Sequence, residues 1–514
     1  MHPGNGLKGE KRLIMQTKTY PPIINDTQYR FSTRDCLGIE SVAASISAEL
    51  CPIVNTVTPR AFYWPFMAWI YYDFYKNSGI PNRNTDTFDK EFLKHQDYFF
   101  VLSAIISNQP DQQNLVGKQV TSQDFRDNRS GPYSFNSAYF KTRYGGMQYY
   151  NAGCLTMQFI TLLDEKNDKP FDFPRVTQFG EEMALAFEDV IKDTEYYKYY
   201  RLRNAPIPKD VLKEYGRIIN IGLKGFDKCK RLLRHHLFET GRSESRRLRQ
   251  CADYLQYIYS KAGKHTLDYP EARNVFYDYY SPRGLRFDIP EDLKQIAVGW
   301  EMVIGRQYLT CGIEMIWKYM LNNLPCPLSF EEWAKRVIES SSISALRNQH
   351  VSVLLENPEL SFQEREFMIT QARQDKVKER MVENGLRVAL SVYSRFRGRN
   401  DLGEAGALLD YGRGRIPGTG SLSFNEWISL VDQYRDKTIQ EFLVHIMRSC
   451  IVDQHKRTCY DKMMRTSQSI DGFYFECVDD LYIRNEHEFQ VDFQGIRMLQ
   501  LMQVMKDLDM FEED

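Results

Sequence analysis

A run of basic residues near the middle of the chain is the strongest chemical signal in the sequence. Residues 201–250 contain 14 lysines and arginines but only five acidic residues. Several of the basic residues recur at helical spacing, so two predicted helices each carry a positive stripe. The candidate nucleic-acid-binding residues are Lys224, Lys228, Arg231, Arg234, Arg242, Arg246 and Arg249. Such stripes can follow the phosphates of DNA without reading its bases.

The far end of the chain carries the opposite charge. Residues 471–514 hold 12 acidic residues against three basic ones, while the whole chain has a net charge of only −1. Two other interpretations of the basic stripes therefore stay open. They could dock protein, including the acidic end of the same chain, or they could form an ordinary solvated surface.

Motifs for catalysis are missing from the sequence. It has no GxxxxGK[ST] phosphate loop, no GxSxG elbow and no HExxH metal motif. Asp164-Glu165-Lys166 matches the acid-x-Lys triplet of some nucleases, but we expect it in a surface turn. We therefore name no catalytic residue, metal ligand or cofactor. An effector enzyme with dispersed catalytic residues, such as a nuclease, is the alternative.

The cysteines and the apolar segments indicate a cytoplasmic protein. Ten cysteines are scattered without a CxxC pair, which favours reduced thiols. The most apolar stretch, residues 61–72, is shorter than the roughly 20 residues that span a bilayer. We expect no membrane partner.

The pattern of helix signals predicts a mainly α fold, a multi-helix bundle with one or two small winged-helix-like hairpin modules. Four capping boxes, in which a hydroxyl residue precedes a glutamate by three positions, mark helix starts. They are Ser329/Glu332, Ser361/Glu364, Ser423/Glu426 and Thr438/Glu441. Residues 290–324 carry one long helical periodicity. Hairpins are predicted over 154–177 and 473–484, each between helices.

Changes in composition divide the chain into five predicted segments. They are an aromatic-rich helical unit (1–107), a loop-rich connection with a winged-helix-like module (108–200), a helical core with the basic face (201–396), a Gly-rich linker (397–422) and an acidic helical and hairpin module (423–514).

Five stretches resemble a prokaryotic family of large helical accessory proteins encoded in anti-phage defence loci, including Lamassu-type partners of SMC-like or ABC ATPases. The stretches are 35–42 (DCLGIESV), 48–52 (AELCP), 57–69 (VTPRAFYWPFMAW), 144–150 (YGGMQYY) and 299–308 (GWEMVIGRQY). The resemblance implies a non-catalytic accessory or scaffold subunit of a defence complex, with protein partners such as an SMC-like ATPase or a nuclease. Its motifs are structural, so they transfer no site residue. With the basic stripes, we expect this subunit to bind a partner protein and the DNA backbone.

Overall fold

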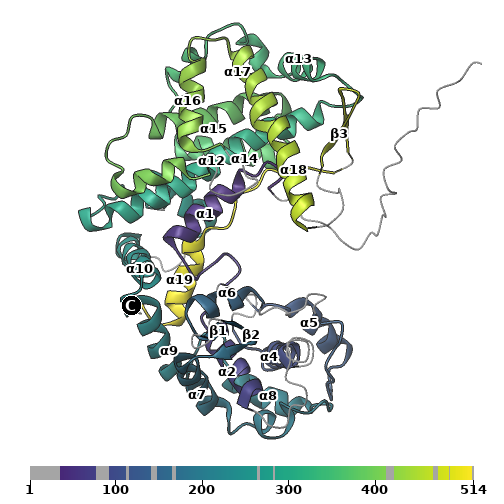
Figure 1. Ribbon diagram of the computed structural model, residues 1–514, viewed down its shortest axis with the longest axis vertical. Helices are drawn as coiled ribbons and strands as arrows, with labels where there is room; N and C mark the ends of the chain where they lie inside the picture. Colours follow the sequence, from purple (N-terminus) through teal and green to yellow (C-terminus); the bar gives the residue numbers. More distant parts are fainter. Residues whose placement is uncertain are drawn as a thin grey trace, which may run out of the picture.

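The computed structural model is dominated by helices, which form two lobes joined by a narrower middle (Figure 1). This confirms the predicted mainly α, multi-helix fold. The structure describes residues 35–58, 60–76, 92–110, 115–139, 148–164, 169–262, 267–281, 284–412, 422–466, 473–485 and 487–511.

The lower lobe is built around aromatic side chains of its first helices. Its elements are α2 (Tyr63–Lys76), α4 (Lys94–Ile106), α5 (Lys118–Asp127), α6 (Gln148–Thr156), β1 (Ile160–Asp164), β2 (Lys169–Val176), α7 (Gln178–Ile191), η4 (Tyr196–Tyr200), α8 (Lys209–Ile218) and α9 (Asp227–Arg234). The ring of Phe62 stacks on that of Phe100 at 4.6 Å and meets that of Phe187 edge-on at 5.7 Å. Residues 63–71 are all buried, because neighbouring helices cover α2 on nearly every side.

The upper lobe surrounds one long helix, α12, in which every residue from Ile296 to Leu321 is buried. The predicted long helix is thus confirmed. Elements of this lobe are η6 (Asn274–Asp278), η7 (Glu291–Leu293), α12 (Lys294–Asn322), α13 (Phe330–Ser340), η8 (Ser342–Ala345), η9 (Val351–Leu355), α14 (Phe362–Arg373), η10 (Lys378–Arg380), α15 (Met381–Phe396), η11 (Gly403–Asp410), α16 (Phe424–Tyr434), α17 (Ile439–His445), η12 (Ile446–Val452), α18 (Asp453–Thr466), β3 (Phe475–Val478) and β4 (Leu481–Arg484).

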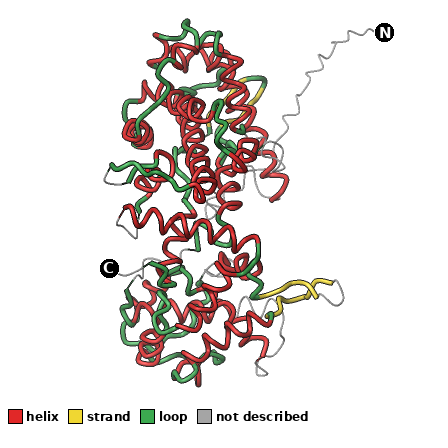
Figure 2. The backbone as a smooth tube through the Cα atoms, turned by 90° about the vertical axis from the view of Figure 1, so that its left-hand side faces the viewer, coloured by secondary structure: helices red, strands yellow, loops and turns green. Residues whose placement is uncertain are grey.

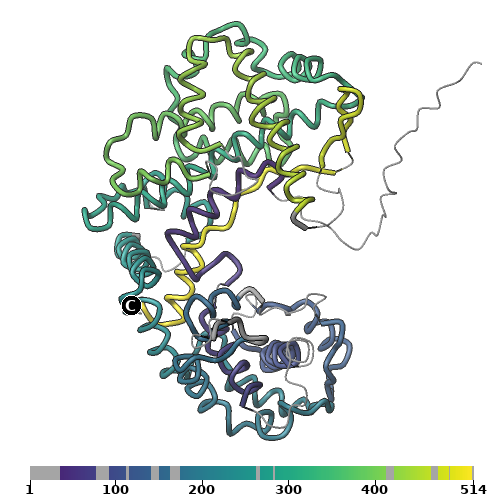
Figure 3. The backbone as a smooth tube through the Cα atoms, viewed as in Figure 1, coloured from purple at the N-terminus to yellow at the C-terminus, as the bar shows by residue number. Residues whose placement is uncertain are grey.

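Segments from both ends of the described chain meet between the lobes (Figure 3). The connecting elements are α1 (Glu40–Leu50), η5 (His235–Glu239), α10 (Ser243–Ala262), α11 (Tyr269–Arg273) and α19 (Arg497–Asp507). Arg497 at the start of α19 donates to the carbonyls of Cys51 and Val54, just after α1. At the other end of α19, Asp507 accepts hydrogen bonds from Arg60, which precedes α2.

Local capping explains where several helices begin. In all four predicted capping boxes the hydroxyl accepts the N–H of the glutamate, and the glutamate accepts the N–H of the capping residue. Each box satisfies two backbone N–H groups that the first helical turn leaves without partners. The sequence therefore predicted these four helix starts correctly.

Each of the two hairpins lies between helices, as predicted, but the first one starts later than expected. Cys154 belongs to α6, and the strands pair only from Ile160, which faces Val176. This hairpin projects from the lower lobe (Figure 2). The second hairpin turns at Asp479 and Asp480, which have positive φ angles as a two-residue turn requires.

Packing contacts cross the predicted segment boundaries. α4, before residue 107, packs on α5 and α8, which lie beyond it, so the N-terminal helices and the following segment share one core. Part of the predicted Gly-rich linker, residues 413–421, lies outside the described residues. Its described part includes η11, which packs on α12.

The close crossing of α12 and α15 yields a stability prediction. A methyl group on Gly385 would lie 2.5 Å from the carbonyl oxygen of Gly312. We expect Gly385→Ala to destabilise the protein by about 1–3 kcal/mol through overpacking, although alanine favours helix. Urea unfolding followed by circular dichroism measures the change.

Gly406→Ala is the matched control, because its new methyl group meets no atom closer than 3.7 Å. Equal stability of the two variants would contradict backbone contact between α12 and α15.

Candidate nucleic-acid interface

Three of the predicted residues, Lys224, Lys228 and Arg231, lie on α9 or just before it. This helix buries Cys229 and Leu233 in the lower lobe, and the opposite face carries exposed Lys228 and Arg231. Because they are three residues apart, these two side chains are neighbours on the helix surface. Lys224 is also exposed, but α9 begins at Asp227, so Lys224 lies in the preceding turn rather than on the helix.

The residues that follow α19 contact the basic residues in the C-terminal half of α9. Arg234 donates to the carbonyl of Leu508 and, at 3.1 Å, to that of Asp509. The Asp509 carboxylate accepts a hydrogen bond from Lys230 at 2.7 Å. Arg234 therefore already makes hydrogen bonds within the protein, and its contact with DNA stays a prediction. This part of α9 contacts the acidic end of the chain, which is one of the alternatives that the charge distribution left open.

Arg242 is also engaged within the protein. Its guanidinium donates to the carbonyl of Thr156, at the end of α6, and lies 3.0 Å from a ring nitrogen of His236. Burial lowers the pKa of His236, and the positive charge of Arg242 contributes to the same shift. These contacts hold the start of α10 against α6, and the phosphate-binding role of Arg242 stays a prediction.

The remaining two predicted residues lie on α10 and differ in their surroundings. Arg249 forms an ion pair with Asp253, one turn later, at 2.8 Å. Arg246 is exposed and has no ion pair with any described residue. Since the pair on α10 partly neutralises Arg249, Arg246 is the more effective cation for an anionic partner.

Four exposed cations without an ion pair to the described residues thus remain from the predicted set. They are Lys224, Lys228, Arg231 and Arg246. Lys228 also lies close enough to α7 to affect Asp189 on that helix. The pKa of Asp189 is lowered mainly by Lys192 and, to a smaller extent, by Lys228. Lys224, Lys228 and Arg231, close together in the sequence on and just before α9, can attract phosphates by charge.

The part of the chain that the structure describes contains no group of three or more His, Cys, Asp or Glu residues that could hold a metal ion. Of the nuclease-like triplet, Glu165 and Lys166 lie outside the described residues. None of the described helices is both long and apolar enough to cross a lipid bilayer.

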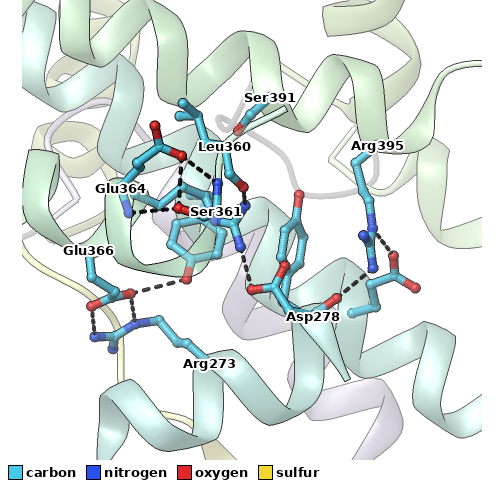
Figure 4. Close-up of polar contacts among 12 residues, drawn as sticks. Arg273, Asp278, Leu360, Ser361, Glu364, Glu366, Ser391 and Arg395 are labelled. Atoms are coloured by element: carbon cyan, nitrogen blue, oxygen red, sulfur yellow. Dashed lines mark hydrogen bonds and ion pairs between the residues drawn. The ribbon is translucent and has the colours of Figure 1, made fainter. Parts of the chain in front are cut away.

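The structure gathers a second polar cluster that sequence spacing does not connect. Three separate segments come together in this cluster, and they contribute Arg273 and Asp278, the region of Leu360 to Glu366, and Arg395 (Figure 4). Arg273 forms a two-bond contact with Glu366, at 2.7 and 2.6 Å. Sequence reasoning missed this cluster because its members are as much as 122 residues apart and form no linear motif.

Comparisons of the chain with protein-family models, with curated proteins and with solved structures found no match. The functional proposals below therefore rest on the geometry and charge of this chain.

The different surroundings of Arg242 and Arg246 predict different effects on stability. We expect Arg242→Ala to cost about 1–2 kcal/mol, because it removes charge-assisted hydrogen bonds. Arg246→Ala should leave the free energy of unfolding unchanged within about 0.5 kcal/mol, as for most exposed sites. Urea unfolding distinguishes them, and a larger loss for Arg246→Ala would contradict this division of the stripe.

Proposed function

We propose that this protein is a helical accessory subunit of a prokaryotic complex, in which it contacts the DNA backbone and a partner protein. The observation that carries the DNA contact is the group of exposed cations around α9 and the start of α10. Lys224, Lys228, Arg231 and Arg246 have no ion pair to the described residues. When lysine and arginine side chains neutralise DNA phosphates, the counterions condensed on the DNA are released into solution. This release favours binding that does not depend on the base sequence.

Contacts within the protein reduce the number of predicted cations that are available to DNA. Arg234 and Arg242 are bound within the protein, and Arg249 is paired on its own helix. Four cations support weak contact with a backbone rather than tight, specific recognition. This strength suits a subunit that holds DNA together with partners in a larger assembly.

Charge reversal at Lys228 and Arg231 tests the DNA contact. We expect Lys228→Glu/Arg231→Glu to weaken binding to a 30-base-pair duplex and to reduce the slope of log K against log salt by roughly 1–2. Fluorescence anisotropy of a labelled duplex across a salt series gives both quantities.

Lys378→Glu/Arg380→Glu is the matched control, since these exposed residues in the upper lobe lie outside the proposed surface. A salt slope that stays the same in the Lys228/Arg231 variant removes the DNA role.

The proposed partner surface is the acidic tip of the β3–β4 hairpin. Asp479 and Asp480 form its turn, and Val478 and Leu481 beside them are 49% and 40% exposed. Apolar side chains next to acidic ones can pack on a partner while the charges set its orientation. Negative charge at the tip would also repel phosphate, which favours protein over DNA here.

Changing the turn without straining it tests this surface. Asp479→Asn/Asp480→Gly removes both charges, and Asn-Gly is the preferred pair for a turn with two positive φ angles. We expect less co-purification of the proteins encoded by neighbouring reading frames, with DNA affinity unchanged. Glu356→Gln/Asp436→Asn neutralises two exposed acids elsewhere in the same lobe. Full co-purification with the turn variant would contradict the assignment.

A further inference from the structure

A cavity of about 680 Å³ opens in the upper lobe between η6, the start of α14 and α15. The wall contains groups from all three elements, including Tyr277, Asp278, Arg365 and Arg395 (Figure 4). Its volume lies in the range of natural small-molecule sites. None of the groups used for the proposed DNA or partner contacts lines this cavity.

Arg365 places a buried positive charge in the cavity wall. Only 3% of this residue is exposed, and its two terminal nitrogens donate to the Leu360 carbonyl and the Asp278 carboxylate. The remaining nitrogen, Nε, is buried and has no hydrogen-bond partner. A charged donor without an acceptor is costly inside a protein, so this position favours a ligand that brings one.

Tyr277 provides a second buried group without a partner. The residue is 1% exposed and its hydroxyl makes no hydrogen bond. Its ring lies 4.9 Å from the guanidinium carbon of Arg365 and 5.0 Å from that of Arg395. The ring thus lies against two guanidinium groups, and the hydroxyl without a partner is a donor suited to an anionic oxygen.

The start of α14 adds backbone donors. The capping box of Ser361 and Glu364 satisfies the N–H of Glu364. The N–H groups of Phe362 and Gln363, also in the cavity wall, have no acceptor within the helix. The positive end of a 12-residue helix dipole therefore faces the same space.

Carboxylates pair with both arginines of the wall and reduce their net charge, but they leave Arg365 Nε without a partner. Arg365 binds the Asp278 carboxylate, and burial raises the pKa of Asp278 above its ordinary value. Arg395 is paired with Glu301 at 2.6 Å, but it also lies in the cavity wall. Glu359 is the other acidic residue of the lining.

We propose that this cavity binds a phosphate group, either inorganic phosphate or the phosphate of a small phosphomonoester. Arg365 Nε, the Tyr277 hydroxyl and the N–H groups of Phe362 and Gln363 are its donors. These donors come from two different elements, which suits a tetrahedral anion with oxygens on several sides. The space beyond the donors accommodates the organic part of a phosphomonoester.

Tyr277→Phe is the sharpest test, because it removes one hydroxyl and nothing else. Since this hydroxyl has no partner in the protein, the variant should be as stable as the parent without ligand. Its affinity for phosphate should fall about tenfold or more, as expected for a lost hydrogen bond to a charged group. Isothermal titration of the full chain with inorganic phosphate, at constant ionic strength in chloride, measures the affinity.

Tyr308→Phe is the matched control for this substitution. The Tyr308 hydroxyl donates to Glu366 at 3.1 Å and does not line the cavity. This variant should lose thermal stability but bind phosphate as the parent does.

A second variant tests the helix end independently. Gln363→Glu adds a negative charge to the first turn of α14, which stabilises the helix but repels an anion in the cavity. Its phosphate affinity should fall by at least about tenfold, whereas Gln374→Glu at the other end of α14 should bind normally.

Titration with adenosine monophosphate distinguishes the two phosphate sources. Tighter binding than inorganic phosphate supports a phosphomonoester, and equal or weaker binding supports the free ion. The proposal is overturned if neither compound binds saturably, or if Tyr277→Phe and Gln363→Glu bind phosphate as the parent does. Neither variant changes a residue of the proposed DNA contact. Failure of the phosphate proposal can therefore be distinguished from failure of the DNA proposal.

Discussion

The arrangement of the whole molecule depends on one buried ion pair between residues near its two ends. Arg60 donates to both carboxylate oxygens of Asp507, at 2.9 and 3.0 Å, and the N–H of Ala61 donates to the same carboxylate. Both side chains are almost fully buried. Removing one partner of such a pair leaves an uncompensated charge and costs about 3–5 kcal/mol. The pair therefore fixes the end of α19 against the start of α2.

This contact determines which basic residues stay available. Because α19 ends at the lower lobe, the next residues reach α9, where Asp509 meets Lys230 and Arg234. Ion pairs between the basic middle segment and the acidic C-terminal segment thus help to stabilise the fold. On the same helix, Lys228 and Arg231 form no ion pair with the described C-terminal segment and stay available to an external anion.

Local signals in the sequence predicted much of the fold. The four capping boxes and the long apolar periodicity of α12 depend on neighbouring residues only, so they could be recognised without the structure. The alternating pattern from Cys154 to Ile160 misled the prediction, because a short stretch of this kind fits both the end of a helix and a strand.

The candidate site was less predictable, since it depends on contacts between distant segments. Helical spacing placed Lys228 and Arg231 on one exposed face, but it could not show that Leu508 and Thr156 accept hydrogen bonds from Arg234 and Arg242. The cavity around Tyr277 was invisible for the same reason, because its donors lie on η6 and α14, two elements that come together by packing on α12.

Lysine footprinting tests the central claim, the contact between the α9 surface and phosphates, most directly. The protein is acetylated briefly with and without a 30-base-pair duplex, and mass spectrometry reports the modification of each lysine. We predict that DNA protects Lys224 and Lys228, while exposed Lys378 in the upper lobe reacts equally in both samples. Equal modification of Lys224 and Lys228 with and without saturating duplex would contradict the account.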